Sequence, residues 1–185
     1  MNIYKYIWTL KTLFRLPFFG KIQMPSYIAN PIFIGNADKI FIGKRTRILP
    51  HSRLEVYEKG NLIFEGDTSI GQNFHCTAGG NLIIRKGVTV AENVYISDIE
   101  HNLNETDSIV VERSKIIKET SIGEYCFIGY GAVILPGTTL GKNCIVGANS
   151  VVKGEFPDNS MIAGIPGRII KVYNINTRKW EKTKF

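Results

Sequence analysis

An aliphatic residue recurs at every sixth position in the C-terminal half of the chain, and this spacing constrains the fold strongly. Small side chains follow four positions later in most repeats: Cys126, Ala132, Thr138, Cys144 and Ser150. The aliphatic residues themselves are Ile122, Ile128, Ile134, Leu140, Val146 and Val152. A helix has a period of about 3.6 residues and a half-buried strand a period of about 2, so neither explains this pattern. A period of six is typical of a parallel β-helix, in which three short strands form one triangular coil.

The same period extends upstream with interruptions. Three shorter runs keep it: Ile42, Ile48 and Leu54; Phe64, Ile70 and Cys76; Ile84, Val90 and Ile96. Insertions in a solenoid collect on loops, so we expect each change of phase to be an insertion at a corner of the coil. A β-sandwich with accidental spacing is the alternative, but six in-phase aliphatic residues argue against it.

The segment IGEYCFIGYGAVILPGTTLGKNCIVGANSVV, followed by AGIPGRIIK, resembles the hexapeptide-repeat acyltransferases. The resemblance covers roughly residues 30–172 and is strongest to galactoside and maltose acetyltransferases and to the O-acetyltransferases of bacterial surface polysaccharides. It implies an all-β, left-handed parallel β-helix, a homotrimer, and acetyl-CoA as the acyl donor. Left-handedness follows from the resemblance alone, since parallel crossovers are otherwise almost always right-handed.

The composition divides the chain into three segments. Residues 25–172 form the predicted β-helix domain, with a polar insertion at 97–115, and residues 173–185 form a basic C-terminal tail. Residues 1–24 carry apolar residues at helical spacing: Ile3, Tyr6, Ile7, Leu10, Leu13 and Phe14. We expect this helix to cap the open first coil, to lie on an anionic membrane surface, or to do both. Its longest uncharged run is far shorter than the roughly 18 residues of a transmembrane span.

The net charge of +7 and the pI of about 9.3 indicate an anionic partner. Scattered basic residues without a recognition motif argue against nucleic acid, and the phosphates of coenzyme A account for the charge. The chain shows no signal peptide, which favours a cytoplasmic enzyme, peripheral at the inner face of the membrane if the helix binds lipid.

Cys126 and Cys144 lie one coil apart at inward positions, so we expect buried free thiols.

His101 is the strongest candidate for catalysis. Acetyl transfer to a hydroxyl requires a base that removes the hydroxyl proton, and imidazole titrates near the working pH. A neighbouring carboxylate could hold one ring nitrogen and raise the basicity of the other. Asp98 and Glu100 are near in sequence, and a backbone carbonyl could serve equally. The resemblance supports the position, because the family's catalytic histidine ends this coil, often in an Asp-His pair where this chain has Glu100-His101.

The other histidines give weaker signals. His75 and Thr77 are candidates for acceptor binding, since the resemblance places an acceptor-binding asparagine near Thr77, and His51 is expected at a corner. The γ-class carbonic anhydrases share the expected fold and bind zinc through three histidines, two of them as His-x4-His. The three histidines here include no such pair, and we predict no metal.

The donor site is predicted from the C-terminal coils. Gly129-Tyr130-Gly131 and Gly147-Ala148-Asn149 should share a corner one coil apart, where small residues let a pantetheine arm run along the backbone. The resemblance implies that Tyr130 and Ala148 contact this arm between neighbouring subunits. It also places Lys153 and Gly154 at donor contacts, and Arg168 and Lys171 at the phosphorylated nucleotide.

These features favour acetyl-CoA-dependent O-acetylation of a carbohydrate hydroxyl, with His101 as general base. The acceptor would be a sugar or a lipid-linked glycan of a bacterial capsule or O-antigen. Two other enzymatic functions remain open: N-acetylation of an amino-sugar nucleotide and acetylation of serine. A solenoid that serves only as an assembly platform would leave His101 without a role.

Overall fold

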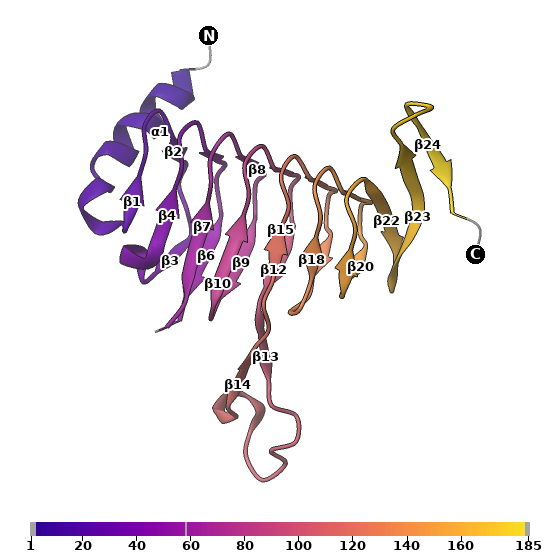
Figure 1. Ribbon diagram of the computed structural model, residues 1–185. Helices are drawn as coiled ribbons and strands as arrows, with labels where there is room; N and C mark the ends of the chain where they lie inside the picture. The colour runs from indigo at the N-terminus through magenta and orange to yellow at the C-terminus, as the bar shows by residue number, and fades with distance from the viewer. Residues whose placement is uncertain (1–2, 58, 184–185) are drawn as a thin grey trace.

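A computed structural model describes residues 3–57 and 59–183, which form a parallel β-helix with one short N-terminal helix (Figure 1). Most strands pair not with the next strand along the chain but with the equivalent strand of the next coil. Three parallel sheets therefore run along the molecule and enclose one core. The predicted fold class is confirmed.

The three sheets take one strand each from successive coils. The first contains β1 (Lys21–Ile22), β4 (Ile40–Ile42), β7 (Asn61–Phe64), β10 (Asn81–Ile84), β15 (Ser121–Ile122), β18 (Thr139–Leu140) and β21 (Glu155–Phe156). The second contains β2 (Tyr27–Ile28), β5 (Arg47–Ile48), β8 (Ser69–Ile70), β11 (Thr89–Val90), β16 (Phe127–Ile128), β19 (Ile145–Val146) and β22 (Ser160–Gly164). The third contains β3 (Phe33–Gly35), β6 (Arg53–Val56), β9 (His75–Ala78), β12 (Tyr95–Ser97), β17 (Val133–Ile134) and β20 (Val151–Val152). Two 3-10 turns, η1 (Leu16–Phe18) and η2 (Ala37–Lys39), flank β1 and β3.

The core consists of the residues that define the six-residue period. All fifteen aliphatic, aromatic and cysteine side chains of the pattern are buried, as are the five small residues that follow in the C-terminal repeats. Alternate side chains of a strand point to opposite faces, so one residue of each two-residue strand enters the prism. Burying one such aliphatic side chain contributes about 1.5–3 kcal/mol. The pattern thus specifies the core directly.

The changes of phase occur where the third sheet meets the first. At the first change of phase β6 and β7 are four residues long, and at the second β9 and β10 are four residues long. Part of each of these two insertions therefore lies in strands rather than in the corner loop. Other corners use left-handed backbone conformations, often at asparagine; Asn73 has φ 56° and Asn93 has φ 59°. Asparagine tolerates this region better than most residues, and Asn73 Nδ2 donates to Asn93 Oδ1 at 2.9 Å.

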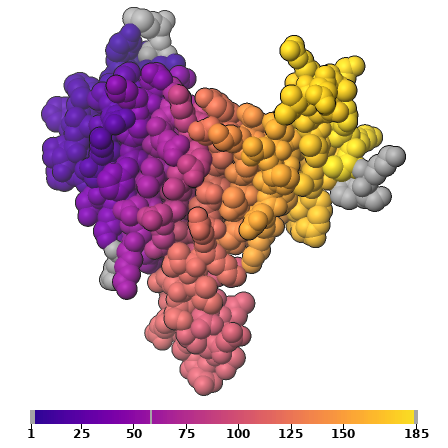
Figure 2. Space-filling view, in the orientation of Figure 1, coloured from indigo at the N-terminus to yellow at the C-terminus, as the bar shows by residue number. Residues whose placement is uncertain are grey.

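The insertion predicted over residues 97–115 leaves the solenoid as a loop, and its two ends form a short antiparallel hairpin. Ser97 still belongs to β12, and the chain then forms β13 (Ile99–His101) and β14 (Lys115–Ile117), which pair antiparallel. A 3-10 turn, η3 (Val110–Glu112), lies in the connecting loop. The hairpin projects from the middle of the solenoid (Figures 1 and 2). The loss of the six-residue period marks the insertion, but it carries no signal for the short antiparallel pairing at its ends.

Both ends of the β-helix differ from the predicted boundaries. The helix α1 (Ile3–Leu13) contacts β2, but β1 already belongs to the first coil, so residues 1–24 are not one separate cap. The predicted boundary at 172 falls inside β23 (Gly167–Asn174), which pairs antiparallel with β22 and with β24 (Lys179–Lys182). The tail is therefore a β-hairpin through most of its length, closed by an edge contact of Tyr173 with Trp180.

Candidate active site

His101 ends β13 and lies between two hollows on the surface. The larger, about 530 Å³, is also lined by Glu100, Lys153 and residues of the hairpin loop. The smaller, about 400 Å³, is also lined by His75 and Thr77. The structure thus brings the candidate base and both candidate acceptor-site residues to one groove, although they come from different coils. A side chain that faces two cavities can contact two substrates at once.

The ring of His101 is half-buried, and its two nitrogens lie in different environments. Nδ1 is shielded from solvent and finds no hydrogen-bond partner among the described residues. A buried polar atom without a partner costs about 1–3 kcal/mol, and such sites often have a functional explanation.

Asp98 does not face His101. Its carboxylate is buried and accepts hydrogen bonds from the backbone amides of Gly79 at 2.6 Å and Gly80 at 2.8 Å. Burial raises the pKa of this carboxyl, and the two amide donors partly oppose the shift. Asp98 therefore holds the start of the hairpin against the turn between β9 and β10, and the structure gives it no orienting contact with the histidine.

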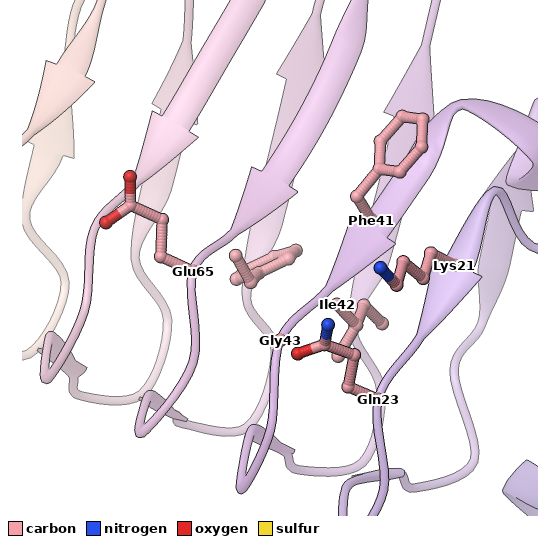
Figure 3. A pocket seen from close by; sticks show the side chains of 7 residues that line it. Lys21, Gln23, Phe41, Ile42, Gly43 and Glu65 are labelled. Atoms are coloured by element: carbon pink, nitrogen blue, oxygen red, sulfur yellow. The ribbon is translucent and has the colours of Figure 1, made fainter.

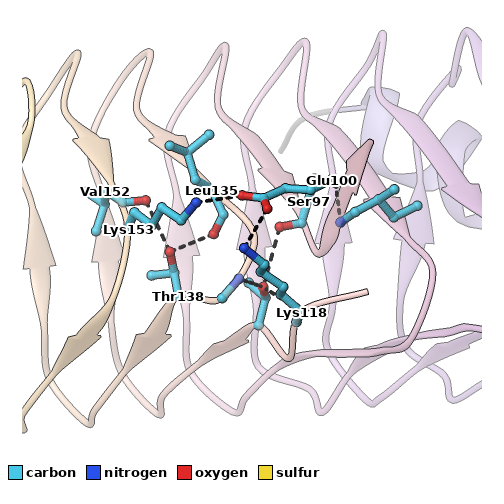
Figure 4. Close-up of polar contacts among 10 residues, drawn as sticks. Ser97, Glu100, Lys118, Leu135, Thr138, Val152 and Lys153 are labelled. Atoms are coloured by element: carbon cyan, nitrogen blue, oxygen red, sulfur yellow. Dashed lines mark hydrogen bonds and ion pairs between the residues drawn. The ribbon is translucent and has the colours of Figure 1, made fainter. Parts of the chain in front are cut away.

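Glu100 binds two lysines instead of the neighbouring histidine (Figure 4). Its Oε2 lies 2.5 Å from Lys118 Nζ, and its Oε1 lies 2.5 Å from Lys153 Nζ. The hydrogen bond from Lys118, and then that from Lys153, lowers the pKa of the Glu100 carboxyl. This triad joins the two ends of the hairpin, and with them the strand that carries His101, to the coil that follows β20.

The smaller hollow is built on the outward face of the third sheet. Register places Arg53, His75 and Tyr95 in one row, and Glu55, Thr77 and Ser97 in the next. His75 Nε2 lies 3.3 Å from Thr77 Oγ1, and its ring contacts Tyr95 edge-on at 5.1 Å. Burial, and then the charge of Arg53, lowers the pKa of His75, which is therefore neutral at neutral pH.

Sequence reasoning missed several residues of this groove. They are Arg53, Glu55, Tyr57, Tyr95 and Lys115, and Lys118 binds Glu100 beside the groove. The spacing is 22 positions from Arg53 to His75 and 20 positions from His75 to Tyr95, and each spacing corresponds to one lengthened coil. Once the coil length is known, this spacing identifies the first row. Lys115 and Lys118 come from the hairpin, and no period predicts them.

The two turns that the sequence predicts at one corner do lie one coil apart. Asn149 N donates to Tyr130 O at 2.8 Å, which stacks the two turns one coil apart. Gly129 must be glycine there, because a Cβ would approach the Ala148 nitrogen to 2.7 Å. Tyr130 and Ala148 are both exposed at this corner. Small residues and close backbone packing fit an extended pantetheine arm.

Arg168 and Lys171 lie on one face of β23. Three positions along a regular strand would put them on opposite faces, but a bulge opposite Met161 and Ile162 adds one residue. Their cross-strand partners are Ala163 and Met161, which are two positions apart and share a face of β22. The two cations can therefore contact one anionic group.

The other two predicted donor contacts follow β20 at the edge of the groove. Lys153 is exposed, and Gly154 has a φ of 113° with open space around it.

Two other observations bear on the choice of site. A hollow of about 180 Å³ on the first sheet is lined by residues that include Lys21, Gln23, Phe41 and Glu65, and none of its lining residues is a histidine (Figure 3). Within residues 3–57 and 59–183, no group of three histidine, cysteine or acidic side chains is placed to hold a metal ion. The three cysteines are buried free thiols.

Comparison with known proteins agrees with this geometry. Residues 119–154 match the family model for the bacterial transferase hexapeptide (six repeats). The chain is 31% identical over 163 residues to the putative lipopolysaccharide biosynthesis O-acetyl transferase WbbJ of Escherichia coli, covering 82% of this chain and 81% of that protein. The chain belongs to the hexapeptide-repeat acyltransferase family. It is therefore an enzyme of acyl transfer, as the sequence predicts.

More distant relatives and solved structures are consistent with the assignment. The galactoside O-acetyltransferase of E. coli is 26% identical over 156 residues, covering 84% of this chain and 65% of that protein. The fold is shared with AntD, an N-acyltransferase from Bacillus cereus solved with dTDP and 3-hydroxybutyryl-CoA, at a TM-score of 0.75 and 17% identity over 90% of each chain. At that identity the likeness establishes the fold alone.

Proposed function

We propose that this enzyme transfers an acetyl group from acetyl-CoA to a hydroxyl of a carbohydrate destined for a bacterial surface polysaccharide. The observation that carries the proposal is the position of His101 between two hollows, one beside Lys153 and one beside His75. The relationship to WbbJ, whose name gives a lipopolysaccharide O-acetyl transferase, supports the same class of acceptor.

In the proposed mechanism His101 acts as general base. Its Nε2 removes the proton from the acceptor hydroxyl as the oxygen attacks the thioester carbonyl. Backbone amides near the thioester stabilise the oxyanion, and the intermediate collapses when the C–S bond breaks. The protonated imidazole then returns its proton to the thiolate of coenzyme A, so no net proton is gained or lost.

The donor would lie along the corner of Tyr130 and Ala148. Arg168 and Lys171, on one face of β23, would bind the phosphates of coenzyme A. Lys153, which lines the larger hollow, would lie nearer the thioester. CoA-bound solved structures with this fold include the acetyltransferase VCA0836 of Vibrio cholerae, at a TM-score of 0.62.

The acceptor would lie in the smaller hollow, against His75 and Thr77. Its lining combines hydrogen-bonding side chains with the rings of Tyr57 and Tyr95. Aromatic rings and polar groups together suit a sugar, which presents C–H faces and hydroxyl edges.

The active enzyme would be a homotrimer with donor sites between subunits. The hairpin loop carries exposed apolar residues, among them Leu103, Ile109 and Val111, that a neighbouring subunit can cover. A neighbour could also supply the hydrogen-bond acceptor that Nδ1 of His101 lacks.

The test compares coenzyme A release by the wild-type enzyme and His101→Ala with a panel of acceptors. Loss of a general base costs about a hundredfold to ten-thousandfold in kcat, whereas folding should survive because His101 lies at a hairpin end. His51→Ala, at a corner, is the matched control. If the enzyme acetylates an amino-sugar nucleotide or serine but no sugar hydroxyl, that compound replaces the carbohydrate as the acceptor. A kcat of His101→Ala within threefold of wild type would refute the role of His101 as general base.

A further inference from the structure

The helix α1 (Ile3–Leu13) turns its apolar side away from the protein. Its inward side carries Trp8 and Thr12, and Thr12 is the buried residue of the helix. The apolar residues that recur at helical spacing point outward and are 42–75% exposed: Ile3, Ile7, Leu10, Leu13 and Phe14. A helix on a soluble protein normally packs this side against the core. A contiguous exposed apolar surface of this kind marks a site of interaction.

Specific polar contacts hold the helix in this orientation. Ile28 N donates to Thr12 Oγ1 at 2.9 Å, and Arg15 Nη1 donates to Ile28 O at 2.6 Å. Lys11 Nζ donates to Asn30 Oδ1 at 3.0 Å, and the ring of Trp8 contacts Tyr27. The contacts satisfy backbone groups of β2, so the outward position of the apolar side is built into the fold.

The surroundings of this apolar surface are positively charged. Residues 1–37 contain four cationic residues and no acidic one; the cations are Lys5, Lys11, Arg15 and Lys21. Beside the helix lies a cavity of about 240 Å³ lined by three cations and three hydroxyl-bearing residues: Lys5, Arg45 and Arg47, with Thr9, Ser26 and Tyr27. Asp67 pairs with Arg45, which leaves the cavity with a net positive charge.

We propose that α1 docks this enzyme on a bilayer that contains anionic phospholipid. The apolar side would enter the boundary between headgroups and acyl chains, and the basic cavity would receive a headgroup phosphate. A second copy of the chain suits the surface poorly, because two such faces would bring like charges together. At 11 residues, α1 is far too short to span a bilayer, and no helix in the described residues is long and apolar enough to do so.

The position of the helix fits this role. It lies at the N-terminal end of the solenoid, whereas the hairpin with His101 projects from the middle (Figure 1). Docking through α1 therefore leaves both hollows beside His101 open. The inference does not depend on the proposed acceptor, since any acetyltransferase of this structure could dock in the same way.

The test is flotation with phosphatidylcholine vesicles and with vesicles of phosphatidylcholine and phosphatidylglycerol. Wild type should float with the anionic vesicles, and salt should weaken the binding. Leu10→Glu/Phe14→Glu should lower the partition coefficient at least about tenfold, since it removes two apolar side chains from the membrane contact and adds two negative charges. Lys5→Glu should reduce binding to anionic vesicles by roughly fivefold or more and leave binding to neutral vesicles unchanged.

Matched controls carry the same changes at exposed positions of the C-terminal hairpin, Ile175→Glu and Lys179→Glu, and should bind like wild type. Turnover of a water-soluble acceptor should be equal in all variants, which shows that they fold. Wild-type enzyme that stays unbound, or variants that float as well as wild type, would overturn the proposal. A change of oligomeric state in Leu10→Glu/Phe14→Glu would do the same, because it would assign the surface to a second copy.

Discussion

Glu100 and Lys153 are 53 positions apart in the chain, and 2.5 Å separates Oε1 of the first from Nζ of the second. The ion pair joins the hairpin that carries His101 to the coil after β20, on the predicted donor side. Lys118 binds the other oxygen of the same carboxylate, so one side chain links three segments.

Glu100→Gln should lower kcat by about two- to tenfold, because partly exposed ion pairs contribute up to about 1 kcal/mol each. The double variant Glu100→Gln/Lys153→Met should lose less kcat/KM than the two single variants predict together, since each single change already breaks the same contact. The matched control is Glu124→Gln, which breaks the exposed pair with Lys142 away from the site. Additive effects would show that the ion pair does not position the hairpin.

Glu100 also predicts a pH dependence of stability. Its folded pKa lies below the ordinary value of 4.5, so the folded state binds this proton less tightly than the unfolded state. The stabilisation is therefore fully present above pH 4.5 and is lost as the pH falls through the lowered value. The drop in thermal midpoint across this acid range should be smaller in Glu100→Gln than in wild type. An equal drop in both would contradict the pairing.

Asp98→Ala should destabilise the enzyme by about 2–5 kcal/mol, because the amides of Gly79 and Gly80 lose their acceptors inside the protein. Urea denaturation measures this loss, and Asp98→Asn, which keeps one acceptor oxygen, should lose less. Asp107→Ala, in the exposed hairpin loop, is the control. If Asp98→Ala is instead folded and stable but has a much lower kcat, the result would support the sequence-based prediction that Asp98 orients the ring of His101.

Arg168→Ala/Lys171→Ala should raise KM for acetyl-CoA at least about tenfold and leave kcat nearly unchanged, since phosphate binding is equal in ground and transition states. Added salt should weaken donor binding to wild type more than to the variant. Arg178→Ala/Lys179→Ala removes the same two side-chain types from the nearby turn and should change neither constant. A loss of kcat at unchanged KM would place the nucleotide elsewhere.

The enzyme should be a homotrimer in solution. Light scattering should give about three times the chain mass of 20.8 kDa. Leu103→Glu/Val111→Glu, on the exposed hairpin loop, should weaken assembly and activity together. A monomer with full turnover would contradict both the assembly and the shared donor site.

The sequence by itself determined the architecture, because in a β-helix each coil repeats the same contacts and the core residues recur at a fixed spacing. The six-residue period from Ile122 to Val152 identified the buried side chains. The same regularity placed Tyr130 one coil from Ala148, and its loss after Ile96 marked the insertion that contains His101. These features are local or periodic, so a one-dimensional pattern contains them.

Only the tertiary structure decided which groups surround the histidine. Neighbours in sequence suggested that Asp98 or Glu100 would orient the His101 ring, but a strand alternates its faces and the hairpin turns both carboxylates toward other partners. The backbone amides at Gly79 and Gly80, and the ammonium groups of Lys118 and Lys153, come from separate coils. Likewise, helical spacing revealed the apolar side of α1, but the hydrogen bonds of Thr12 and Arg15 with Ile28 decided that it faces outward. Contacts between distant segments depend on coil lengths and insertions, which no single local pattern encodes.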